Sequence, residues 1–164
     1  YARMAYIDTM TGLGNRTAFL EENKSNAIFP GMISYIMMDA NNLKTINDTL
    51  GHNKGDELII TIAKCMRKAV GHNGQCYRIG GDEFVIILKN KTAAETEEII
   101  NKVRCEIEFA DKQSDITISV AIGYVWTDTE QKNLEDLMQH ADDEMYQDKK
   151  KTKENKSKEN THSI

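Results

Sequence analysis

Runs of apolar residues alternate along the chain with segments in which apolar residues recur every three or four positions. Residues 32–38 form an apolar run interrupted only by Ser34, and Phe84–Leu88 form another. Neither run alternates with polar residues, so both are expected to be strands buried on both faces. Residues 116–126 are rich in β-branched side chains and predict a further strand.

Four segments have the apolar spacing of amphipathic helices. One of them opens with a capping-box pattern, in which Thr92 and Glu95 can each bond the backbone N–H of the other. The expected helices cover residues 15–25, 53–70, 92–110 and 133–147.

The paired glycines Gly80 and Gly81 predict a tight two-residue hairpin turn, because glycine tolerates positive φ angles. The resulting order is helix, strand, helix, hairpin, helix, strand, helix. It fits an α/β sandwich (α+β) with a mostly antiparallel sheet flanked by helices. This arrangement places Asp39 at the end of one strand and Asp82 at the hairpin tip.

The composition is that of one globular domain, with 164 residues, 40% apolar and 29% charged. The net charge of −5 is unevenly distributed. Six lysines and two glutamates give residues 149–164 a charge of +4, so the remaining residues carry −9. An acidic body argues against nucleic-acid binding, and residues 154–164 are expected to form a lysine-rich disordered tail.

The location of the protein is predicted from three further features. The three cysteines lack any CxxC pair, which favours reduced thiols in a cytoplasmic protein. No run of about 18 apolar residues is present to span a membrane. The chain begins with Tyr1 and shows no signal peptide, so we expect a piece of a longer protein, whose other parts could attach it to a membrane.

Candidate chemistry centres on two carboxylates. Asp39 and Asp82 would repel each other if strand end and hairpin tip meet, unless a cation lies between them. Mg²⁺ suits such a site, because it commonly binds one or two carboxylates plus substrate phosphates. The residues leave simpler interpretations open: Asp39 could cap a helix, and the acidic hairpin could be only a turn.

Four motifs resemble, in order, those of the GGDEF family, the diguanylate cyclases. The segment Gly80–Phe84 is identical to the five-residue motif that gives the family its name. The segment Asp8–Arg16 is similar to the family's D-x-L-T-G-L-x-N-R opening. Residues 39–56 are similar to its D-x-x-x-x-K-x-x-N-D-x-x-G-H-x-x-G-D block, and residues 141–149 to its closing motif. The resemblance implies a domain over residues 1–153 with a fold of the polymerase-palm or nucleotide-cyclase type.

The resemblance implies an activity and a metal site. The family joins two GTP molecules into cyclic di-GMP, releasing two pyrophosphates, with Mg²⁺ or Mn²⁺. Asp39, the carbonyl of Ala40 and Asp82 would hold the metal. Asp82 or Glu83 would help to activate the attacking 3′-hydroxyl, and Lys44 would neutralise phosphate charge.

The resemblance also implies which residues bind the substrate. Asn47 and Asp56 would bind the guanine edge, and His52 would lie near the nucleoside. The remaining substrate contacts would be to the phosphates, from Gly80, Gly81, Lys149 and Lys153. The family normally has Arg at position 153, and Lys keeps the charge but loses the planar fork.

One departure concerns feedback by the product. Many family members bind cyclic di-GMP at R-x-x-D, whose Arg and Asp positions are Gly71 and Gly74 here. Glycine offers neither charge, so product inhibition through that site is not expected. The resemblance further implies that two domains must face each other as a homodimer and that an upstream sensor domain exists. A catalytically silent GTP-binding or interaction module is the alternative.

Asp8 and Arg16, both within the opening motif, are expected to pair and to fix the turn there. Arg78, beside the predicted hairpin, is expected to pair with a surface carboxylate rather than with phosphate.

Overall fold

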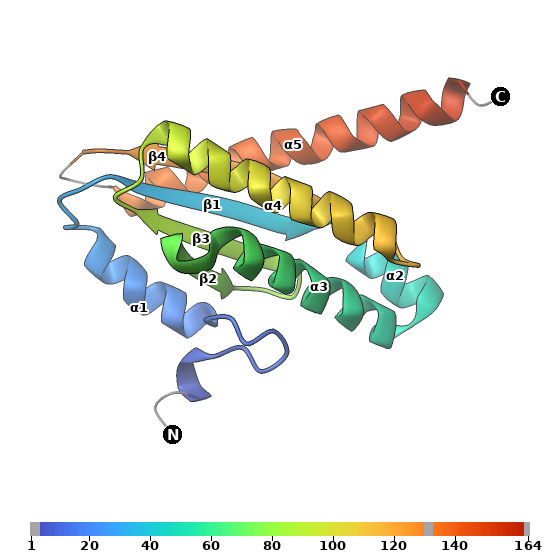
Figure 1. Cartoon of the computed structure of the whole chain (residues 1–164), viewed down its shortest axis with the longest axis horizontal. Helices are drawn as coiled ribbons and strands as arrows, with labels where there is room; N and C mark the ends of the chain where they lie inside the picture. The colour runs from blue at the N-terminus through green and yellow to red at the C-terminus, as the bar shows by residue number, and fades with distance from the viewer. Residues whose placement is uncertain (1–3, 130–132, 163–164) are drawn as a thin grey trace.

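A four-stranded antiparallel sheet forms the centre of the molecule, with helices on both faces (Figure 1). The computed structural model describes residues 4–129 and 133–162. The strands are β1 (Ile33–Ala40), β2 (Gly74–Arg78), β3 (Glu83–Lys89) and β4 (Val120–Thr127), in the order β2-β3-β1-β4. All neighbouring strands are antiparallel, which confirms the predicted fold class.

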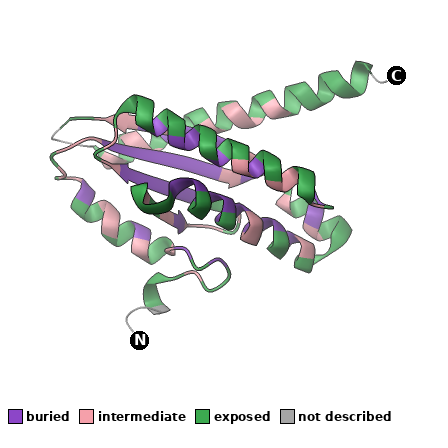
Figure 2. Cartoon of the chain, in the orientation of Figure 1, coloured by how far each residue is buried: buried purple, intermediate pink, exposed green. Residues whose placement is uncertain are grey.

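Each face of the sheet packs on its own pair of helices. The helices α3 (His52–Val70) and α4 (Ala93–Gln113) cover one face, where Met38 and Phe84 are fully buried. The other face packs on α1 (Arg16–Asn26) and α5 (Leu134–His162). Figure 2 shows the buried strands between these partly exposed helices.

Short elements complete the chain. The helix α2 (Leu43–Leu50) follows β1, and two 3₁₀ turns are η1 (Met4–Tyr6) and η2 (Gly71–Asn73). None of the helices in the described ranges is long and apolar enough to cross a membrane.

Several predicted elements are confirmed. The segment Phe84–Leu88 is buried throughout, as its unbroken apolar pattern predicted. The α4 capping box forms, with Thr92 N donating to Glu95 Oε1 at 3.0 Å and Glu95 N donating to Thr92 Oγ1 at 3.1 Å. The expected strand at 116–126 begins later, at Val120, although Ile116 and Ile118 are also buried.

Helix α2 was not predicted. Its apolar residues Leu43, Ile46 and Leu50 recur at helical spacing, but the helix has only eight residues, fewer than the window over which such spacing predicts a helix, and it buries only Ile46. It begins after Asn42, whose φ of 68° is left-handed. Asparagine tolerates this conformation better than most residues, and the turn separates β1 from α2 with few residues.

The lysine-rich segment was predicted to be disordered, and its described part is instead helical. Helix α5 continues through residues 154–162, and residues 163–164 lie outside the described ranges. The preceding turns of α5 pack on the sheet, so extending the helix needs no new nucleation. Lysine and glutamate are also good helix formers. The disorder prediction rested on the charged composition and did not include the helix that precedes this segment.

The hairpin between β2 and β3 forms, but its turn differs from the predicted one. Four residues, 79–82, separate the strands, and neither Gly80 nor Gly81 has a positive φ. The amides of Ile79 and Gly80 both donate to the Glu83 carbonyl, at 2.9 and 3.4 Å. At Gly80 a Cβ would lie 3.1–3.3 Å from the Glu83 side chain, so space rather than φ favours glycine there.

Helix α5 lies against β4 with no room for a side chain at Gly123. A Cβ at this position would collide with the helix backbone at Ala141, Glu144 and Met145. The neighbouring inward position is Ala121, which is also small and fully buried. The two small residues therefore set how closely α5 approaches the sheet.

We expect Gly123→Ala to lower the free energy of unfolding by about 1–3 kcal/mol, the usual cost of overpacking. Chemical denaturation measures the loss. Gly81→Ala is the matched control, because a Cβ there meets nothing within 4 Å and the φ is not positive. Equal stability of the two variants would contradict the close packing of α5.

Candidate active site

The ends of β1 and β3 bring the predicted carboxylates together. Asp39 pairs with Glu83 across the antiparallel register. One residue further, the amide of Ala40 donates to the carbonyl of Asp82 at 2.8 Å. Backbone hydrogen bonds between the two strands thus hold Asp39, Ala40, Asp82 and Glu83 at one end of the sheet.

The Asp39 carboxylate is largely enclosed, with 13% of its side chain exposed. Lys149 of α5 donates from Nζ to Asp39 Oδ2 at 2.8 Å. The second oxygen, Oδ1, is buried and has no hydrogen-bond partner. An unpartnered buried carboxylate oxygen is costly, so the site has unused capacity for a cation.

The charges at this site act on one another. Burial raises the pKa of Asp39 above its ordinary value of 3.8, and the negative charge of Asp82 raises it further, while the Lys149 hydrogen bond opposes both. The hydrogen bond to Asp39 raises the pKa of Lys149, aided by the charges of Asp39 and Asp82. The ammonium of Lys149 is therefore bonded to Asp39 and also attracted by the charge of Asp82.

The donor set suits a hard divalent cation whose coordination is completed by a ligand. Asp39 Oδ1, the Asp82 carboxylate and backbone carbonyls are oxygen donors of the kind that Mg²⁺ and Mn²⁺ accept. Across residues 4–129 and 133–162 there is no cluster of three His, Cys, Asp or Glu side chains able to hold a metal alone. Substrate phosphates would have to supply the other ligands.

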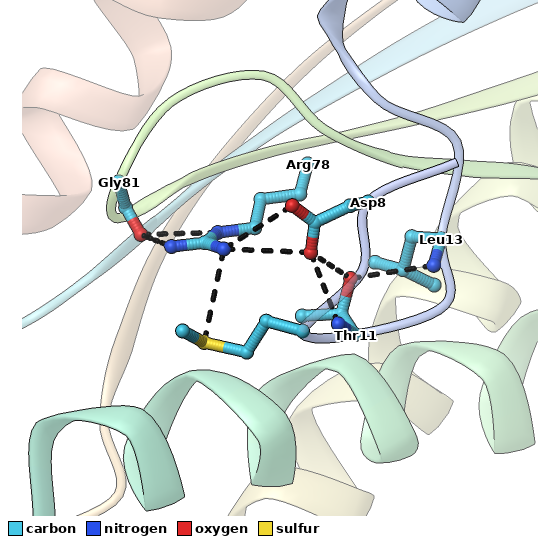
Figure 3. Close-up of polar contacts among 6 residues, drawn as sticks. Asp8, Thr11, Leu13, Arg78 and Gly81 are labelled. Atoms are coloured by element: carbon cyan, nitrogen blue, oxygen red, sulfur yellow. Dashed lines mark hydrogen bonds and ion pairs between the residues drawn. The ribbon is translucent and has the colours of Figure 1, made fainter. Parts of the chain in front are cut away.

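Arg78 holds the turn that carries Asp82 (Figure 3). Its Nε and Nη2 donate to the Gly81 carbonyl at 3.2 and 2.9 Å. Its Nη1 donates to both oxygens of Asp8 at 3.3 and 3.4 Å. The Gly81 carbonyl directly precedes Asp82, so this guanidinium positions the peptide next to the metal-binding candidate.

Asp8 is itself fixed by its own loop. Its Oδ2 accepts hydrogen bonds from Thr11 N at 3.0 Å and Thr11 Oγ1 at 2.7 Å. The expected pair of Asp8 with Arg16 is wrong: Asp8 pairs with Arg78, which does bind a carboxylate as predicted. The sequence separation of Asp8 and Arg78 hid this contact.

Two of the predicted guanine-binding positions lie where α2 meets α3. Asn47 of α2 is half-buried against Gly55, where a Cβ would collide with Asn47 Oδ1. Asp56 follows Gly55 on α3 and is exposed. The absence of a side chain at Gly55 therefore lets Asn47 lie beside the first turns of α3.

The other predicted positions are exposed or partly exposed. Lys44, His52 and Lys153 are exposed, and their side chains make no hydrogen bond or ion pair in the described part of the chain. Glu83 is exposed and lines a groove of about 550 Å³ between α1 and α5, with Met37, Met138 and Asp142 among its other residues. Gly80 and Gly81 directly precede Asp82 in the turn.

Sequence reasoning missed the residue that anchors α5 beside the site. Asp148 Oδ2 accepts a hydrogen bond from the Ile122 amide of β4 at 2.8 Å and forms an ion pair with Arg104 of α4 at 3.5 Å. Asp148 immediately precedes Lys149. A lone Asp in a lysine-rich segment gave no signal of this role.

The fold and site define an α/β sandwich domain with two carboxylates at one end of its antiparallel sheet, and comparison with known proteins identifies its family. The family model described as "Diguanylate cyclase, GGDEF domain" matches residues 5–155. The chain belongs to this family.

Relatives and solved structures agree with this assignment. The chain is 33% identical to diguanylate cyclase DgcN of Escherichia coli, over 90% of this chain and 38% of the relative. It is 27% identical to cyclic di-GMP phosphodiesterase PdeB of Shewanella oneidensis, over 85% of this chain and 17% of the relative. The GGDEF domain of DgcB from Caulobacter crescentus, in complex with c-di-GMP, is similar with a TM-score of 0.78 and 26% identity, covering 89% of this chain and 91% of that one. The chain spans less than two fifths of the length of these two curated relatives.

We expect Arg78→Lys to loosen the turn, because an ammonium lacks the fork that bonds Gly81 and Asp8 together. Amide hydrogen exchange over residues 79–83 should accelerate roughly tenfold, as expected for losing about 1.4 kcal/mol of local hydrogen bonding.

Arg67→Lys is the matched control. Arg67 Nη2 donates to the Thr11 carbonyl at 2.8 Å, so it holds the same loop from α3, and the structure gives it no bond to the turn. Its replacement should affect exchange in residues 8–13 only. Equal acceleration of the turn in both variants would contradict the role of Arg78.

Proposed function

We propose that this chain is a diguanylate cyclase domain that condenses two GTP molecules into cyclic di-GMP and releases two pyrophosphates. One observation carries the proposal: Asp39 and Asp82 meet at one end of the sheet, and a buried oxygen of Asp39 is left without a partner. Family membership supports the choice of substrate. The named phosphodiesterase among the relatives shows that membership alone does not decide the activity of a whole protein.

In this proposal Asp39, the Ala40 carbonyl and Asp82 hold Mg²⁺ or Mn²⁺. The metal would withdraw charge from the phosphate oxygens during attack at the α-phosphorus. Lys44, Lys149 and Lys153 neutralise charge on the phosphates, because phosphoryl transfer depends mainly on positioning and on charge stabilisation.

The substrate side of the proposal uses α2, α3 and the turn. Asn47 and Asp56 bind the guanine edge, where an ionised carboxylate can accept from two N–H groups, and His52 lies near the nucleoside. Gly80 and Gly81 give the phosphates access to the backbone. Glu83 or Asp82 accepts the proton of the 3′-hydroxyl that attacks the partner's GTP.

Each domain binds one GTP in this mechanism, so two copies must face each other. A homodimer is therefore part of the proposal, as is an upstream sensor domain that controls it. The rival proposal is a silent module that binds GTP without turning it over.

Incubation of the chain with GTP and Mg²⁺, followed by chromatography, tests the activity. The chain should be fused to a dimerising coiled coil, since the proposed reaction needs two domains. Formation of cyclic di-GMP with two equivalents of pyrophosphate is the expected result. GTP binding without product would instead favour the silent module.

We expect Asp39→Asn to lower turnover at least roughly hundredfold, because a direct metal ligand should matter at least as much as the residues that support ligands. Asp136→Asn is the matched control, since Asp136 is exposed on the first turn of α5. Unchanged turnover in the Asp39 variant would refute the metal assignment.

We also expect no inhibition by cyclic di-GMP at a separate site. Gly71 and Gly74 stand at the R-x-x-D positions, and a Cβ at Gly74 would lie 2.5 Å from the Ile87 carbonyl oxygen. Any loss of initial rate on adding product should disappear as GTP is raised, because only competition in the active site remains. Inhibition that persists at saturating GTP would contradict this prediction.

A further inference from the structure

Lys149 supplies the positive charge at the two carboxylates. Its ammonium donates to Asp39 at 2.8 Å, while the charge of Asp82 also acts on it. About one third of the Lys149 side chain is exposed, so its end can leave Asp39 without the helix moving. The four-carbon stem of lysine permits such a change of partner.

The position of Lys149 conflicts with a metal at the same carboxylate. A divalent cation bound to Asp39 would face a positive ammonium already bonded to the other oxygen of that group. Asp39 can bind the metal without this repulsion only if the Lys149 ammonium moves to another anion nearby. Nucleotide phosphates are such anions, and they also complete the metal's oxygen ligands.

We propose that Lys149 is an exchangeable counter-ion that makes metal binding depend on the nucleotide. Without GTP the ammonium neutralises Asp39 and opposes metal entry; with GTP it moves to the phosphates and releases the carboxylate. The proposal rests on the proposed function, because GTP is the ligand that draws Lys149 away. Metal and nucleotide then favour each other's binding by the same factor.

Calorimetry with Mn²⁺ alone tests the first half. Lys149→Met removes the charge and keeps a good helix former, so Mn²⁺ should bind at least about fivefold more tightly than to the wild type, the lower end of usual coupling. Lys151→Met is the matched control on the same helix and should leave Mn²⁺ affinity unchanged. Lys149→Arg retains the charge and should bind Mn²⁺ no more tightly than the wild type.

The same titration with a GTP analogue, whose α- and β-phosphorus atoms are joined by methylene, tests the second half. The analogue should raise Mn²⁺ affinity strongly in the wild type and less in Lys149→Met. Circular dichroism verifies folding, and Lys149→Gln replaces the Met variant if that one is unfolded.

Two failures can be told apart. If the wild type binds the analogue but charge removal at Lys149 leaves Mn²⁺ affinity unchanged, the exchange is refuted and the proposed function stands. If the wild type does not bind the analogue with Mn²⁺, the proposed function fails, and the exchange fails with it.

Discussion

The close approach of α5 to the sheet at Gly123 is the constraint on which the candidate site depends. The helix backbone occupies the space in which a side chain would stand, so α5 is fixed at a short distance from β4. Asp148 then bonds the Ile122 amide and fixes the helix along the strand. Lys149 is the next residue, and this placement brings its ammonium to Asp39.

The second determinant is the antiparallel register of β1 and β3. It sets Asp39 opposite Glu83 and lets the Ala40 amide bond the Asp82 carbonyl. Arg78 holds the preceding carbonyl, that of Gly81. Two successive carbonyls in the turn are therefore fixed by different parts of the chain, which keeps an exposed and glycine-rich turn in one conformation.

Most of the fold and the pairing of the two carboxylates could be predicted from the sequence. The features that could not be predicted depend on contacts with distant parts of the chain, on the elements that precede them or on segments too short to show a pattern. The buried strands could be predicted because apolar runs such as Phe84–Leu88 contain no alternating polar residues. The proximity of Asp39 and Asp82 could be predicted because one lies at a strand end and the other at the hairpin tip. The hydrogen bond between Asp8 and Arg78 could not be predicted, because the two residues are 70 positions apart and no local sequence pattern links them. Helix α2 was missed because it has only eight residues, too few for its helical spacing of apolar residues to stand out. The helical residues 154–162 were missed because their order depends on the docked turns before them.

Under the proposed function an acidic body binds a highly negative nucleotide, which requires local positive charge, and lysines are the candidates to supply it. At physiological salt, charges further apart than about 8 Å are largely screened, so the surplus of negative charge elsewhere matters little at the carboxylates. Lys149 is already bonded there, and Lys44 and Lys153 are exposed and unpaired within the described part of the chain. In the proposed function Lys44 and Lys153 would offer phosphates two free ammonium groups, and Lys149 would offer a third only by giving up Asp39, the step that would open this carboxylate to a metal.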